Sequence, residues 1–156
     1  MEFKYSTGNK KIGKDTVIFN MGSATECSSK KAGLCDIDCY ALKAEIQYKN
    51  TLPARQHQEK YWLANDSFTI AEAIQKAVSR NTKVKITHVR VNESGDFHTS
   101  ECLDKLIEIA EMLPKTKFYT YTHRSDLIDD STHMRLPKNL VINTSDWPVS
   151  KLLRIR

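Results

Sequence analysis

The sequence has no long apolar run. None of its apolar stretches approaches the length of a membrane span, and residues 1–8 contain no apolar segment of signal-peptide type. It also shows no low-complexity linker and no internal repeat. With 156 residues, 40% of them apolar and 28% charged, the chain is expected to form one globular domain over residues 1–156. We expect a protein of the reducing cytoplasm without a membrane partner.

Charge of one sign is not concentrated anywhere in the chain. The net charge is +5 and the isoelectric point is about 9.0, but the lysines and arginines are scattered in small groups. A net positive charge of this size is compatible with a nucleic acid or another anionic partner. It is also typical of an ordinary solvated surface, which is the simpler interpretation.

Cysteine is scarce, and its distribution is uneven. Of the four cysteines, Cys27, Cys35 and Cys39 fall within thirteen consecutive positions, in a polar, glycine-containing segment typical of a loop. They could be small buried side chains, or two of them could form a disulfide that leaves the third thiol unpaired. Loop cysteines in a reducing compartment are more often metal ligands, and three thiolates can hold a metal ion or an iron–sulfur cluster with one coordination position open.

The spacing of the three cysteines favours an iron–sulfur cluster over zinc. Structural zinc sites usually combine two separated Cys or Cys/His pairs, and this sequence has no second pair. An uneven triad in one loop is more typical of a [4Fe–4S] cluster with one differentiated iron, and zinc is the alternative. The fourth ligand could be Cys102, His98, a residue of a partner or an exogenous ligand.

Strand and helix patterns alternate along the chain, which predicts βα units and a mainly parallel sheet. Apolar or β-rich segments predict about four strands, at residues 16–21, 84–91, 117–122 and 139–143. Helical patterns occur at residues 40–48, 53–64, 69–78 and 100–113. Thr69 and Glu72 have capping-box spacing, and Ser100 is the expected N-cap of the last helix. The predicted fold is α/β, either part of a TIM-like barrel or a small open sheet.

Polar residues follow each predicted strand, at the edge where α/β folds bind ligands. The cysteine loop follows the first strand. A carboxylate at Asp96 could accept hydrogen bonds from a ligand, or it could form a turn that caps the next helix. We therefore expect a pocket for a small ligand beside the cysteines, and its predicted lining residues are Ser94, Asp96, His123, Arg124 and Ser145. The sequence assigns no catalytic residue.

A set of short motifs resembles the phage gene product 88 domain family, in the same order from about residue 6 to residue 148. The motifs are Thr7-Gly8-Asn9-Lys10-Lys11-Ile12-Gly13, Thr25-Glu26-Cys27, Cys39-Tyr40-Ala41-Leu42-Lys43-Ala44-Glu45 with Arg55 downstream, Glu93-Ser94-Gly95-Asp96-Phe97, Phe118-Tyr119-Thr120-Tyr121-Thr122, Leu136-Pro137-Lys138-Asn139-Leu140 and Ser145-Asp146-Trp147. The resemblance implies a virus- or mobile-element-encoded protein, acting in the host cytoplasm, whose cysteines look like iron–sulfur ligands. It implies no particular activity.

Two departures from known patterns bear on function. The family pattern continues into a tail with further cysteines, so this chain is expected to be shortened at its C-terminal end. A cysteine triad in the first βα loop of a half-barrel also resembles radical S-adenosylmethionine enzymes, although the spacing here differs from their Cys-x3-Cys-x2-Cys motif.

Three hypotheses about function follow from the sequence. The first is an iron–sulfur protein whose open iron faces a polar pocket. The second is a zinc- or cluster-stabilised module that binds nucleic acid, a host protein or a phage protein. The third is a degenerate radical enzyme. Because an incomplete barrel leaves open strand edges, a homodimer is a further expectation.

Overall fold

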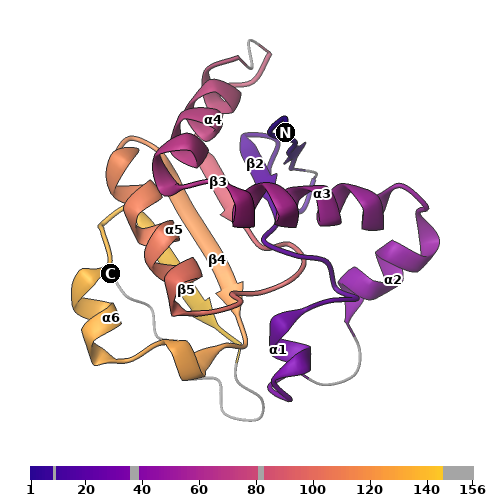
Figure 1. Cartoon of the computed structure of the whole chain (residues 1–156). Helices are drawn as coiled ribbons and strands as arrows, with labels where there is room; N and C mark the ends of the chain where they lie inside the picture. Colours follow the sequence, from indigo (N-terminus) through magenta and orange to yellow (C-terminus); the bar gives the residue numbers. More distant parts are fainter. Residues whose placement is uncertain (9, 36–38, 81–82, 146–156) are drawn as a thin grey trace.

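A five-stranded, mostly parallel sheet forms the centre of the fold (Figure 1). The structure is a computed structural model that describes residues 1–8, 10–35, 39–80 and 83–145. The strands lie side by side in chain order: β1 (Ser6–Thr7), β2 (Thr16–Phe19), β3 (His88–Val91), β4 (Lys117–Thr122) and β5 (Leu140–Thr144). Only the β1–β2 pair is antiparallel. The prediction of an α/β fold with βα units is confirmed, and the extra strand is the short β1.

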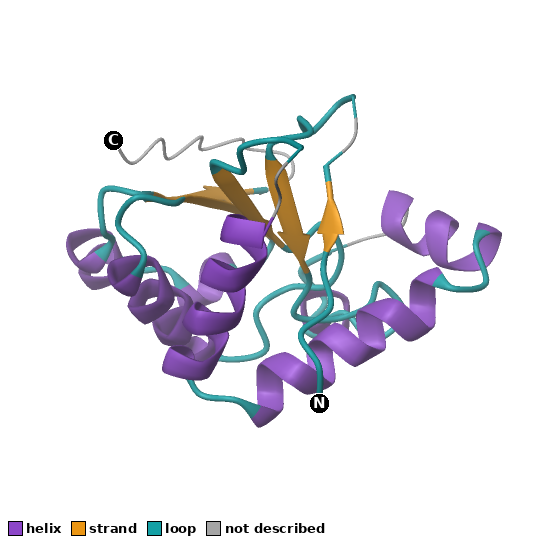
Figure 2. Cartoon of the chain, turned by 90° about the horizontal axis from the view of Figure 1, so that it is seen from above, coloured by secondary structure: helices purple, strands orange, loops and turns teal. Residues whose placement is uncertain are grey.

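Helices connect the parallel strands. They are α1 (Ser28–Lys31), α2 (Tyr40–Gln47), α3 (Thr51–Ala64), α4 (Ser67–Arg80), α5 (Ser100–Met112), the 3-10 turn η1 (Ser125–Leu127) and α6 (Asp130–Arg135). Figure 2 shows α3, α4 and α5 on the same side of the sheet. Consecutive parallel strands in chain order, each joined by a crossover, are the arrangement of half a βα barrel.

The hydrophobic core lies between this helical layer and the sheet. Alternate strand residues point toward the helices because side chains of a strand alternate between its two faces. Trp62 of α3 and Ile74 of α4 pack against them and are at most 1% exposed. Complete burial of side chains of this size stabilises a fold by about 1.5–3 kcal/mol each. The strand residues of the core are Val17, Phe19, Val89, Val91, Phe118, Leu140 and Ile142.

The opposite face of the sheet is polar and aromatic from β3 onward. Arg90 of β3 pairs in register with Tyr119 of β4, and Tyr121 lies two residues further along the same strand. Tyr119 is partly exposed and Tyr121 is 47% exposed. This face is therefore accessible beside the carboxyl ends of the strands, where the predicted site lies.

Several predicted boundaries are wrong. The strand predicted at 84–91 begins at His88, because its partner strand β2 begins at Thr16, the residue that pairs with His88. Helix α4 begins at Ser67, so Thr69 is not its cap. The carboxylate of Asp66 accepts the Thr69 N–H at 2.8 Å and takes that role.

Other differences concern short elements. The residue before α5 is Thr99, so Ser100 is its first helical residue and not the N-cap. Four short elements are not predicted from the sequence: β1, α1, η1 and α6, which are two, four, three and six residues long. Asp146 and Trp147 lie outside the described residues. Among the residues that the structure describes, no helix is both long and apolar enough to cross a bilayer.

Candidate metal centre

Cys27, Cys35 and Cys39 line one cavity of about 420 Å³ at the carboxyl ends of β3, β4 and β5. The polar residues that share this lining are Ser94, Asp96, His123, Ser145, Ser29, Arg90, Asn92 and Glu93, together with the tyrosines Tyr40 and Tyr121. The structure thus brings together the three cysteines and four of the five polar residues that the sequence predicts. Arg124 is the exception, since its side chain does not line this cavity.

A second cavity, of about 430 Å³, adjoins the same cysteines from the side of α1 and α2. Ala24, Cys27, Cys35 and Cys39 line both cavities, whereas Lys30 and Leu42 belong to the second alone. The three thiol-bearing residues therefore stand between the first cavity, which lies on the sheet side and is called the polar cavity below, and the second cavity, on the side of α1 and α2. A group held by these cysteines would be reachable from the polar cavity.

Short helices fix the backbone at two of the cysteines. Cys27 precedes α1 and Cys39 precedes α2, and their carbonyls accept the N–H groups of Lys31 and Lys43 at 3.1 and 3.3 Å. At the third cysteine, the N–H of Cys35 donates to the carbonyl of Ser29 at 3.3 Å. The chain reaches Cys35 through Gly33, whose φ of +72° lies in the left-handed region that glycine adopts without steric cost.

A buried ion pair joins the cysteine loop to the helices. The Glu45 side chain is 2% exposed and lies 2.8 Å from Nη1 of Arg55, which is 7% exposed. Oε1 of Glu45 also accepts the N–H of Ala24 at 2.7 Å, and Oε2 accepts the N–H and hydroxyl of Thr25 at 3.1 and 2.8 Å. Glu45 thus holds the segment just before Cys27 against the helix that begins just after Cys39.

The hydrogen bonds to Glu45 control its protonation. Burial raises the pKa of this carboxyl, but the bonds from Ala24, Arg55 and Thr25 outweigh burial and leave the pKa below its ordinary value of 4.5. The group is therefore an anion at neutral pH. Glu45 and Arg55 belong to the sequence motifs, but the sequence predicts no role for them, because residues ten positions apart on two helices give no local signal of pairing.

Asp96 lines the cavity, but its carboxylate is already engaged by the protein. Oδ1 accepts the N–H of Phe97 at 2.8 Å and the hydroxyl of Thr122 at 2.5 Å, and Oδ2 accepts the N–H of His123 at 2.8 Å. Burial raises the pKa of Asp96, against the lowering effect of the bonds from Thr122, His123 and Phe97. The carboxylate joins the loop after β3 to the end of β4 and does not cap α5, and its contact with a ligand stays a prediction.

Arg124 has a similar structural role beside the cavity. Its guanidinium donates to both carboxylate oxygens of Asp126 at 2.9 and 3.0 Å, and Nη1 donates to the carbonyls of Phe97 and His98. These contacts hold the loop after β3, and contact of Arg124 with a ligand stays a prediction. Ser94 is 3% exposed and donates to Glu45 at 3.3 Å, and the Ser145 N–H donates to the carbonyl of Thr122.

The loops after β2 and β3 touch each other at two glycines. A Cβ added to Gly95, whose φ is +74°, would lie 2.6 Å from the carbonyl oxygen of Gly22. Asn20 connects the same two loops, because its side chain accepts the Ser94 N–H at 2.9 Å and donates to Gln58 at 2.8 Å. This close approach brings the cysteine loop over the end of β3.

The residues proposed as the fourth ligand lie elsewhere. Cys102 is 6% exposed and belongs to the hydrophobic core, and Nε2 of His98 lies 2.9 Å from the carbonyl of Met21 and 3.2 Å from Glu59. Neither lines the two cavities. Within the described ranges, no three His, Cys, Asp or Glu side chains are close enough together to form a ready-made metal site. The donor chemistry of three thiols on one cavity nevertheless fits a thiophilic metal or cluster.

A comparison with models of known protein families finds a match for this chain. The model of the family described as gene product 88 matches residues 3–147. The chain belongs to the gene product 88 family. This confirms the resemblance to a phage family that the motifs predicted. Searches of curated proteins and of solved structures find no significant match.

Proposed function

We propose that this gene product 88 protein binds one [4Fe–4S] cluster through Cys27, Cys35 and Cys39. The observation that supports it is the shared lining of two adjoining cavities by these three residues and no other cysteine of the described chain. Three thiolates leave one iron of such a cluster without a protein ligand. That position would face the polar cavity, beside Ser94, His123 and Ser145.

The protein's own residues supply the surroundings of this centre. Glu45 and Arg55 hold the flanks of the cysteine loop, and Asp96 keeps the ends of β3 and β4 together. When bound, the cluster would supply an iron that acts as a Lewis acid or binds a small ligand. A cavity of about 420 Å³ that is lined by polar groups has the size of a small-molecule site.

The test is iron, sulfide and zinc analysis of protein purified without oxygen. We expect brown protein with about four irons and four sulfides per chain and broad absorbance near about 400 nm. Cys27→Ser, Cys35→Ser and Cys39→Ser should each bleach the protein, whereas Cys102→Ser, the matched control, should keep the colour. Colourless protein with one zinc per chain would contradict the proposal and favour the zinc-stabilised module.

Two further measurements separate the alternatives. If the protein is a module for nucleic acid, it should bind DNA or RNA with strong salt dependence, and loss of the metal should not abolish binding. If it is a degenerate radical enzyme, S-adenosylmethionine should change the electron paramagnetic resonance spectrum of the reduced cluster. The iron–sulfur proposal is tested by the metal and sulfide content alone, and it makes no prediction for either of these two measurements.

A further inference from the structure

Two buried side-chain N–H donors, on residues that line the polar cavity, have no acceptor among the residues that the structure describes. They are Nε of Arg90 and Nδ2 of Asn92, and both residues line the cavity. A buried donor without a partner costs about 1–3 kcal/mol in a folded protein, so such groups are usually explained by a ligand, an ion or a water. Two of them on one cavity point to a bound group that offers acceptor atoms.

The orientation of Asn92 is fixed by its other atoms. Asn92 is 4% exposed, and its Oδ1 accepts the N–H of Met21 at 2.9 Å. The backbone of Asn92 has a φ of +65°, a conformation that Asn tolerates better than most residues. Because Oδ1 is committed to Met21, the amide cannot flip to give Nδ2 a protein acceptor without breaking that bond.

Arg90 is held in place by aromatic side chains. Its Nη2 donates to the hydroxyl of Tyr40 at 3.3 Å, and its guanidinium carbon lies 5.4 Å from the centre of the Tyr121 ring. The Tyr40 hydroxyl in turn donates to the carbonyl of Glu93 at 2.7 Å. No carboxylate of the described residues forms an ion pair with Arg90. The positive charge is thus positioned at the cavity and is not neutralised by these residues.

We infer that Arg90 and Asn92 form a subsite for the anionic group, phosphate or carboxylate, of a small-molecule ligand. A planar guanidinium with free N–H groups matches the oxygens of either anion, and the neighbouring amide adds a neutral donor. Both residues come from β3 and the residue that follows it, not from the cysteine loop. The subsite therefore does not depend on the presence of a cluster, although a ligand bound there would lie in the cavity that the cluster is proposed to face.

The experiment is calorimetric titration of the full chain, as purified, with inorganic phosphate, adenosine monophosphate and malonate at constant ionic strength. We expect saturable binding of at least one probe. Arg90→Gln should weaken it by about tenfold to a hundredfold, the usual contribution of a charge-assisted hydrogen bond, and Arg90→Lys should restore part of it. Phosphate and malonate distinguish the two anions, and adenosine monophosphate shows whether a ring adds affinity.

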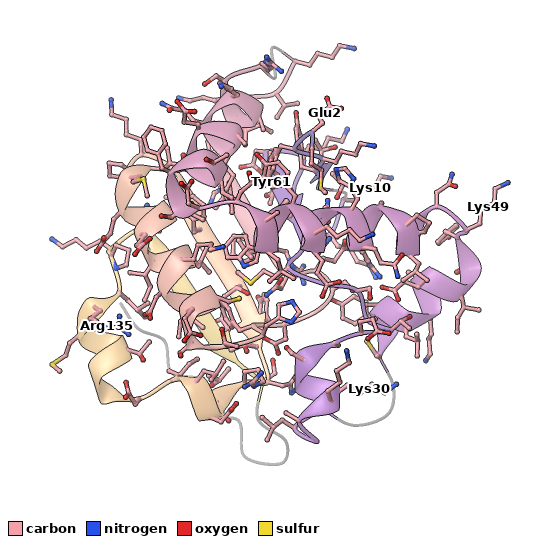
Figure 3. The ribbon with its side chains drawn as sticks, in the orientation of Figure 1. Glu2, Lys10, Lys30, Lys49, Tyr61 and Arg135 are labelled. Carbon is pink, nitrogen blue, oxygen red and sulfur yellow. The ribbon has the colours of Figure 1, made fainter. Side chains whose placement is uncertain are left out.

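Two further variants make the test specific. Asn92→Asp keeps an acceptor for Met21 and replaces the free N–H group by a charged oxygen, so it should abolish anion binding. Arg135→Gln removes one positive charge from α6. Figure 3 shows Arg135 at the left, and α1 and α2 lie at the right. This variant should bind the probes as the wild type does. Circular dichroism checks that each variant is folded.

Two results would overturn the inference. One is the absence of saturable binding for all three probes. The other is equal weakening by Arg90→Gln and Arg135→Gln, which would show a general effect of surface charge. Because the titration is read without reference to iron, its outcome is independent of the metal analysis. Anion binding by colourless protein would refute the cluster alone.

Discussion

At the scale of single residues, Glu45 determines how the cysteine loop is held. Its two oxygens accept hydrogen bonds from Ala24 and Thr25, which precede Cys27, and one oxygen pairs with Arg55 of α3. An ion pair this deeply buried stabilises the fold little more than an apolar pair would, because removing both charges from water costs free energy. Removing one partner is costly, since the other charge is left buried and unpaired.

Glu45→Gln should therefore lower the free energy of unfolding by about 3 kcal/mol, because Arg55 loses its counterion in a buried site. Urea unfolding at pH 7 measures this change. The matched control is Glu26→Gln, the same substitution in the exposed pair with Lys31, whose side chains are 50% and 64% exposed. It should leave the unfolding midpoint nearly unchanged. Equal effects of the two substitutions would show that the Glu45 pair has no special role.

The protonation of Glu45 also predicts a pH dependence. Its pKa is lowered in the folded protein, so the unfolded chain binds more protons in the window below the ordinary value of 4.5. The stabilisation from Glu45 is complete above that value and is lost as the pH falls through the folded-state pKa. Urea unfolding between pH 6 and about pH 3 should show a steeper loss for the wild type than for Glu45→Gln. Parallel curves would contradict the lowered pKa.

At the scale of elements, the sequence predicts best where periodicity is long. The β-rich composition of β4 and the apolar spacing of α5 predict both elements almost to the residue. The short α1 and β1 have too few residues for any period to show, and their positions depend on contacts with distant segments. The site follows the same rule. Strand ends place Ser94, Asp96 and His123 on one edge, but the engagement of Asp96 by Thr122 arises only from tertiary packing.

Asn139 shows how one side chain can complete a helix. Its Nδ2 donates to the carbonyls of Ala110, Leu113 and Thr116 at 2.8, 3.1 and 2.9 Å, in the segment where α5 ends and the regular helical ladder of hydrogen bonds stops. Asn139→Ala should lower the free energy of unfolding by about 1–3 kcal/mol, because these partly buried carbonyls lose a donor. Thermal or urea unfolding measures the loss. The neighbouring exposed Lys138→Ala is the control and should change stability little, and a loss as large in Lys138→Ala would contradict this account.

At the scale of the whole molecule, the fold joins a well-buried half to a cysteine-bearing half. Helix α5 buries six residues against the sheet, whereas α2 buries only Ala41 and Glu45, and α1 only Ser29. Segments with little buried surface open locally at a small free-energy cost, while the central strands open only with global unfolding. A group bound by the three cysteines would cross-link the less buried half, from Cys27 to Cys39. The homodimer expected from open strand edges stays a prediction.

Hydrogen exchange of backbone amides should reveal this division and link it to the metal. In metal-free protein, we expect amides of α1 and α2 to exchange much faster than those of α5, β3 and β4, because the former open without global unfolding. In brown, cluster-loaded protein, residues 28–47 should exchange more slowly, and removal of iron by a chelator with a mild oxidant should restore the fast rate. The rates in α5 serve as the internal control and should stay constant. Equal slowing in α5 and in residues 28–47 would mean that iron stabilises the whole fold, and the cysteine-bearing half would then not be an independent unit.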